Sequence, residues 1–275
     1  NVNRVEDDPE YDFITTVSPW ITLGLNGKSA GARLTYAPSR VYYARTQDNR
    51  YWRHRLSADA FSQITRRLRA TIAGSYLQSE DPADAEPGYN GFQRIEQVDS
   101  ETVETETYDY TVRRGRSKYY TYSANAALNY QFGQRDSIGL RYYYGGTEND
   151  DPSLEDSRYY RPTMDVAYWF TYTWGVDLSG GYERGEFSND DDNSTTDETT
   201  VSDDFDRWFG SARLIHQFNR HIAGNVQYAM NRILYDGETE DERIHDISAG
   251  FDYQIDSDKD LSVQLGYSIV ERPGL

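Results

Sequence analysis

Apolar and polar residues alternate with a period of two along most of the chain. Between positions 120 and 132, the even positions carry apolar or aromatic side chains, and the odd positions carry mainly Thr, Ser, Asn and Gln. The same alternation returns at 68–76, 138–144, 163–170, 222–230 and 261–269. This period is typical of β-strands with two unlike faces. About twelve strands of roughly ten or more residues fit the sequence, which is the length that a tilted membrane strand requires.

The turns between these strands fall into two sets. Short turns are expected at 26–28, 65–67, 133–135, 173–175, 219–221 and 256–258. Longer, acidic connections are expected at about 80–117, 147–158, 187–206 and 236–243, with a shorter one near 46–50. Short turns at one end and long loops at the other are typical of bacterial outer-membrane barrels. We therefore predict a single all-β domain over 1–275, an antiparallel transmembrane up-and-down β-barrel in the bacterial outer membrane with long acidic extracellular loops.

Aromatic residues support a membrane-spanning barrel, because they gather near both ends of the predicted strands. Those expected near the short turns are Trp20, Phe132, Trp169, Trp174 and Phe218, and those near the long loops are Tyr43, Trp52, Tyr120, Tyr144, Tyr160 and Trp208. Two such girdles mark the two membrane interfaces of a barrel. A soluble β-sandwich also alternates, but it predicts shorter strands and no pair of girdles.

The composition excludes several other classes. Hydrophobic residues make up 37% of the chain and aromatic residues 15%, with a mean hydropathy of −0.87. No apolar run approaches the ~20 residues of a membrane helix, and aromatic residues this frequent argue against disorder. The net charge of −18 argues against a nucleic-acid partner. The absence of Cys excludes disulfides and thiolate metal sites.

The ends of the chain suggest further strands. If the turn at 26–28 is periplasmic, both the first and the last predicted strand have their outer ends on the extracellular side. Complete bacterial barrels have an even strand number and both termini inside. We therefore expect one more strand beyond each end and a native barrel of about fourteen strands.

Several segments in the first 82 residues resemble a known family. They are DFITTVSP at 12–19, LTYAPS at 34–39, RHRLS at 53–57, TRRL at 65–68 and SEDP at 79–82. Their order resembles that of Gram-negative outer-membrane β-barrel porins associated with exopolysaccharide and PEP-CTERM gene clusters. Beyond residue 82 only the barrel pattern is shared. The resemblance implies an outer-membrane pore tied to envelope polysaccharide secretion, and it brings no catalytic residues.

The polar face of the predicted strands is expected to line the lumen, because charges at this depth are costly toward lipid. This face carries Arg33, Arg53, Arg55, Asp59, Arg69, Asn125, Asn129, Arg141, Asp165, Asp177, Glu183, Arg213 and Gln227. Two interpretations stay open. The arginines could hold anionic or hydroxyl-rich substrates in an open conduit, or they could pair with the carboxylates and stiffen a barrel that has no open path.

The sequence contains weak candidates for other chemistry. Carboxylates suit Ca²⁺ and the divalent cations that bridge lipopolysaccharide, and the best candidates are Asp190, Asp191 and Asp192. They lack the Gly and distant Glu of an EF-hand loop, so a solvated loop without a cofactor is favoured. Ser57 and His54 are the one local nucleophile–base pair, and their offset of three puts them on opposite faces of a strand. We expect no enzymatic activity.

Two functions are compatible with these features. The first is a pore for export or passage of polysaccharide or other polar solutes, surrounded by outer-membrane lipid and lipopolysaccharide, with a periplasmic export protein as a candidate partner. The second is a structural barrel that holds a partner, such as a multi-haem electron conduit, a surface filament or another surface protein. An open water path favours the first function, and a copurifying partner favours the second.

Overall fold

The alternating segments form one continuous antiparallel sheet. The computed structural model describes residues 13–45, 50–80, 117–152, 154–188, 204–236, 241–256 and 259–272. Its strands are β1 (Ile14–Val17), β2 (Ile21–Asn26), β3 (Ala30–Tyr43), β4 (Tyr51–Gln63), β5 (Leu68–Ser79), β6 (Tyr119–Gln131), β7 (Ser137–Asn149), β8 (Asp156–Trp169), β9 (Trp174–Ser188), β10 (Phe205–Gln217), β11 (Ile222–Tyr235), β12 (Glu242–Asp256) and β13 (Lys259–Glu271). Within the described ranges, no helix has the length and apolar character needed to cross a membrane.

β1 and β2 are two parts of one interrupted strand. Both pair with β3, and they keep the same register on either side of the gap. This register puts Pro19 in the gap opposite Pro38 of β3. Proline has no backbone N–H to donate, so the hydrogen-bond ladder is interrupted there. The thirteen strands therefore occupy twelve positions in the sheet, as the alternation predicts.

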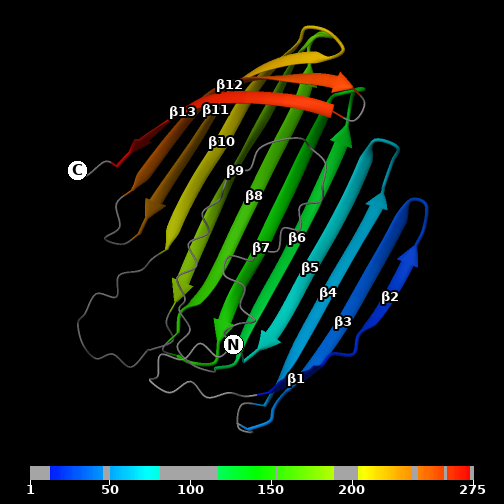
Figure 1. Cartoon of the computed structure of the whole chain (residues 1–275), viewed down its shortest axis with the longest axis vertical. Coiled ribbons are helices and arrows are strands. Elements are labelled where there is room, and N and C mark those ends of the chain that lie inside the picture. The colour runs from blue at the N-terminus through cyan, green and yellow to red at the C-terminus, as the bar shows by residue number, and fades with distance from the viewer. Residues whose placement is uncertain are drawn as a thin grey trace.

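The sheet is strongly curved, and from β3 onward its strand order follows the chain (Figure 1). Each strand from β3 to β13 is hydrogen-bonded to the next, and β1 with β2 and β13 lie at the two ends of the order. β12 and β13 turn across the top of the view in Figure 1. Because every pairing is antiparallel, all short turns lie at one end of the sheet and all other connections at the opposite end.

The predicted short turns agree with the strand bounds except in one place. The turn predicted at 173–175 is wrong, because β8 ends at Trp169 and β9 already begins at Trp174. The Thr171 hydroxyl closes this turn by accepting hydrogen bonds from the backbone N–H groups of Thr173 (3.3 Å) and Trp174 (2.9 Å). β7 and β8 also extend into the connection expected at 147–158.

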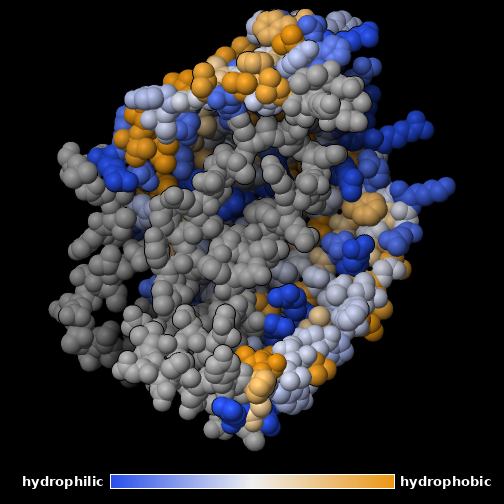
Figure 2. All heavy atoms as spheres, viewed as in Figure 1, coloured by the Kyte–Doolittle hydropathy of each residue, from blue (hydrophilic) through white to orange (hydrophobic). Residues whose placement is uncertain are grey.

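One face of the sheet is apolar and exposed. The register puts Leu128 beside Leu140 and Leu140 beside Met164, and these side chains are 46%, 48% and 48% exposed. The same face continues across the sheet through the exposed residues Leu23, Leu25, Ile72, Leu178, Leu214, Val226, Ile247 and Leu265. Figure 2 shows apolar residues gathered over β12 and β13, at the top of the view. An apolar surface of this extent is suited to lipid and not to water.

The opposite face, here called the inner face, is polar and concave. Side chains on it meet across an intervening strand. Arg213 of β10 lies 3.9 Å from Asp252 of β12, with β11 between them. The rings of Tyr159 and Phe205 lie 6.5 Å apart, with β9 between their strands. Contacts over a whole strand require a sheet that curves toward this side.

Most of the predicted girdle residues lie near a strand end on the apolar face, and three do not. Tyr43 is buried on the inner face, where it packs with Val41 and Tyr51. Trp169 also lies on the inner face, since its register partner is Gly175. Trp20 lies midway between the ends of the β1–β2 strand, far from the turn at 26–28. Parity decides the face in each strand, and proximity to a turn does not.

Candidate pore-lining face

The predicted lumen residues all lie on the inner face. Cross-strand partners include Arg33 with Asp59, Arg69 with Asn129, and Asp177 with Arg213. The rest of the predicted set occupies further positions of the same face, namely Arg53, Arg55, Asn125, Arg141, Asp165, Glu183 and Gln227. The structure thus brings the set onto one surface, and it divides that surface into two parts.

The first part is a buried ion network on β8 to β11. Arg161 donates to Glu183 over 2.5 Å from Nη2 to Oε1, and Arg207 lies 3.5 Å from the other carboxylate oxygen. The Arg207 Nε also donates to Asn231 Oδ1 at 2.8 Å. The guanidinium of Arg161 lies 5.8 Å from the ring centre of Tyr143. The two arginines thus share one buried carboxylate, and removal of that carboxylate would leave both without their counter-charge.

Ion pairs that are less buried extend this network toward the short turns. Arg141 Nη2 lies 2.5 Å from Asp165 Oδ1, and both side chains are more than a third exposed. Arg213 lies 3.9 Å from Asp252 and is the direct register partner of Asp177. On β7 to β12, therefore, the arginines of the inner face have acidic neighbours.

The sequence interpretation missed several members of this network. Arg161, Arg207, Asn231 and Asp252 were not among the predicted lumen residues, although each lies on the inner face. For three of them the alternation contained the information, because Arg161, Arg207 and Asn231 have the same parity as the predicted residues Asp165, Arg213 and Gln227 on their own strands. No residue of β12 was predicted, so Asp252 had no such reference.

The second part is a group of arginines on β3 to β5 without acidic partners. Arg33, Arg55 and Arg69 are exposed on the inner face. Within the described residues, none of the three forms an ion pair, and Arg69 lies 5.1 Å above the Phe61 ring. Asp59 is opposite Arg33 in register, but no ion pair joins the two. This part of the face carries an excess of positive charge.

A row of hydroxyl groups crosses the same strands. Thr22 and Thr35 are hydrogen-bonded at 3.1 Å, and Ser75 and Ser123 at 2.8 Å. Ser57 stands between these pairs as the register partner of both Thr35 and Ser75. The row spans β2 to β6 on the inner face. Hydroxyl groups both donate and accept, so such a row can exchange hydrogen bonds with water or with a polyhydroxylated solute.

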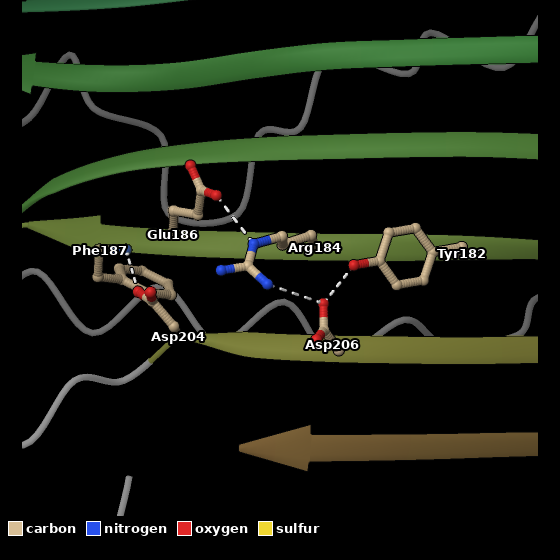
Figure 3. Close-up of polar contacts among 6 residues, drawn as sticks. All are labelled: Tyr182, Arg184, Glu186, Phe187, Asp204 and Asp206. Carbon is tan, nitrogen blue, oxygen red and sulfur yellow. Dashed lines mark hydrogen bonds and ion pairs between the residues drawn. The ribbon is translucent and has the colours of Figure 1, made fainter. Parts of the chain in front are cut away.

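A charged cluster lies on the apolar face, which is called the outward face from here on, and differs from both parts of the inner face. Arg184 donates from Nε to Glu186 at 2.8 Å, and its Nη1 lies 3.5 Å from Asp206 (Figure 3). The Tyr182 hydroxyl donates to the same Asp206 oxygen. This cluster lies at the loop end of β9 and β10, beside the ring of Trp208, which is 4.7 Å from Tyr182. Its position is that of a polar border above the apolar band.

The metal candidates Asp190, Asp191 and Asp192 lie outside the described residues. Among the residues that the structure does describe, no group of three His, Asp or Glu side chains is arranged to hold a metal ion. The possibility of Ca²⁺ at the acidic loop stays a prediction from the sequence.

A solved structure with a TM-score above 0.5 shows the fold. The ferric-catecholate import receptor Fiu from E. coli K12 matches with a TM-score of 0.53 and 11% identity over 95% of this chain, which spans 54% of the receptor. A Pseudomonas aeruginosa FadL homologue matches at 0.43 with 10% identity, over 91% of this chain and 68% of the homologue. The CymD monoaromatic hydrocarbon channel matches at 0.39 with 10% identity, over 94% of this chain and 82% of the channel. This chain has the fold of an outer-membrane β-barrel.

No family model matches the sequence, and no curated protein matches it. The resemblance to porins of exopolysaccharide gene clusters therefore stays a prediction. The fold and the exposed apolar face agree with each other, because a barrel wall of this kind presents its apolar side to the lipid of the outer membrane.

Proposed function

We propose that the chain forms the wall of a water-filled outer-membrane pore for polar solutes that carry negative charge or many hydroxyl groups, polysaccharide among them. In this proposal the short turns face the periplasm and the longer connections face outward. The observation that carries it is the group of exposed arginines Arg33, Arg55 and Arg69 on the inner face, which form no ion pair with any residue that the structure describes. We propose no catalytic step.

The positions of these arginines support passage through a large part of the membrane. Arg69 pairs with Gln63 at the short-turn end of β4, and Arg55 lies eight residues away along β4, toward the other end. At about 3.3 Å per residue this is roughly 26 Å along the tilted strand, a large part of the ~30 Å hydrocarbon core. An anionic solute would meet positive charge at each stage of its path.

The two interpretations left open by the sequence then apply to different strands. On β7 to β12 the ion pairs stiffen the wall, and on β3 to β5 the arginines and the hydroxyl row remain open to solutes. Weak hydrogen bonds from hydroxyl groups favour a solute that slides without being trapped, as a secreted glycan must.

Single-channel recording in planar bilayers tests the proposal. The wild-type chain should conduct and should prefer anions in the reversal potential measured across a salt gradient. The triple variant Arg33→Gln, Arg55→Gln, Arg69→Gln should lose this preference, while Arg40→Gln on the outward face should keep it. A tetramer of galacturonic acid should block the wild-type pore more strongly than the triple variant.

Two results would reject the pore. One is the absence of conductance from correctly folded protein in the bilayer. The other is a conducting pore whose ion preference is unchanged by the triple substitution. A tightly copurifying protein combined with no conductance would favour the structural barrel that holds a partner.

A further inference from the structure

The arginines of the outward face all lie close to the loop ends of their strands. On that face of the described strands they are Arg40 of β3, Arg158 of β8, Arg184 of β9, Arg232 of β11 and Arg243 of β12. Each is within four residues of the strand end that leads to a longer connection. They form a basic border above the apolar band, at the height where lipid headgroups meet a barrel wall.

Three arginines of this border have an aromatic or acidic partner near the guanidinium group. Arg40 lies 5.2 Å from the ring centre of Trp52. Arg158 lies 3.9 Å from Glu148. Arg184 is held between two carboxylates, as Figure 3 shows.

Arg232 and Arg243 differ from the other three. They are direct register partners on neighbouring strands, so the two side chains project from the same face of the sheet next to each other. Within the described ranges, neither makes a hydrogen bond or an ion pair, and the Nε of each is buried without an acceptor. Glu271 of β13 is the register partner of Arg243, but no ion pair joins them.

The surroundings of this pair are those of a membrane interface. On the membrane side, the Tyr228 hydroxyl and His245 Nδ1 are hydrogen-bonded at 2.8 Å, with their rings stacked at 6.1 Å. Trp208, which is 52% exposed, is the register partner of Arg232 on β10. Aromatic residues of this kind sit at headgroup level, so the two arginines lie at the height of lipid phosphates.

We propose that Arg232 and Arg243 form a binding site for a phosphate group of a phosphorylated glycolipid in the outer leaflet. Two like charges directly opposite each other on neighbouring strands destabilise the sheet, with Cβ atoms about 5 Å apart. A single phosphate between them would remove this repulsion and accept hydrogen bonds from both guanidinium forks. The inference uses the orientation of the proposed function, with the loop end outward, and does not depend on whether the pore conducts.

Lipid binding to the full chain tests this site. The protein, purified in detergent and stripped of lipid, would be titrated with diphosphorylated lipid A and followed by native mass spectrometry. The double variant Arg232→Gln, Arg243→Gln should bind at least tenfold more weakly than wild type. Arg40→Gln removes the same charge from the same border and should bind as wild type does. Arg243→Lys keeps the charge without the fork and should lose a few-fold.

The choice of lipid separates the possible sources of the phosphate. Dephosphorylated lipid A should bind wild type and the double variant equally weakly, and phosphatidylglycerol should bind wild type more weakly than lipid A. Equal binding of lipid A by wild type and the folded double variant would overturn the site. Equal affinity for phosphatidylglycerol, or displacement of lipid A by millimolar inorganic phosphate, would overturn the glycolipid assignment. The conductance of the Arg232→Gln, Arg243→Gln variant should equal that of wild type. Loss of lipid binding with unchanged conductance concerns the lipid site alone and leaves the proposed pore unaffected.

Discussion

Arg161 donates a charged hydrogen bond of 2.5 Å to Glu183, and the two side chains are only 16% and 6% exposed. The pair joins β8 and β9 on the inner face. Arg33 and Asp59 are also opposite each other in register, on β3 and β4, yet no ion pair joins them. The same kinds of residue thus stiffen one side of the wall and leave charge available on the other.

Removing the buried carboxylate should destabilise the fold. Glu183→Gln leaves Arg161 and Arg207 buried without their counter-charge, so we expect a loss of about 3 kcal/mol in the free energy of unfolding. Urea unfolding in lipid vesicles measures it. Asp165→Asn breaks an exposed pair and should cost less than about 1 kcal/mol. Equal losses for the two variants would show that the network does not stabilise the wall.

Removing the acid that faces the arginines should strengthen anion preference. Asp59 is the acidic residue of the inner face on β3 to β5. Asp59→Asn should therefore shift the reversal potential further toward that of chloride, without loss of conductance. Ser57→Asn, at the next inner-face position of β4, introduces the same side chain without changing charge and should leave the potential where it was. A shift toward cations in Asp59→Asn would contradict the proposed path.

Two adjacent residues of β6 test which face meets lipid. Leu128 lies on the apolar face and Asn129 on the inner face. Leu128→Arg puts a charge into the hydrocarbon layer and should cost about 2 kcal/mol or more in unfolding free energy. Asn129→Arg adds the same side chain to the aqueous side and should cost much less. Refolding yield into vesicles and the urea midpoint measure both losses. A larger loss for Asn129→Arg than for Leu128→Arg would contradict the membrane assignment.

The contact between Gly175 and Trp169 should tolerate no added methyl group. A Cβ at position 175 would lie 2.7 Å from Cδ2 of the Trp169 ring, whereas a Cβ at Gly24 meets no atom within 4 Å. Gly175→Ala should therefore lower stability by about 1–3 kcal/mol through overpacking. Gly24→Ala, also on the inner face of a strand, should have little effect. Thermal unfolding followed by gel mobility compares the two, and an unchanged Gly175→Ala would mean that the ring moves freely.

Much of the architecture was predictable because it depends on local backbone geometry. Successive side chains of a strand point to opposite faces, so the alternation alone assigns Leu128 to one face and Asn129 to the other. The short turns were predictable for the same reason, with the exception of the one at 170–173. There the alternation continues almost unbroken, and hydrogen bonds to the Thr171 hydroxyl decide where the chain reverses.

The sequence by itself therefore determined the strands, their two faces and the arginines that share the polar face. Only the tertiary structure decided which of those arginines carry a free charge. Arg161 and Glu183 are 22 positions apart in the sequence, and the register of β8 on β9 makes them neighbours. On the outward face, the register of β11 on β12 likewise brings Arg232 and Arg243 side by side, and among the described residues the Nε of each has no acceptor. Which side chains form ion pairs depends on the register between neighbouring strands, and the sequence of a single strand does not specify that register.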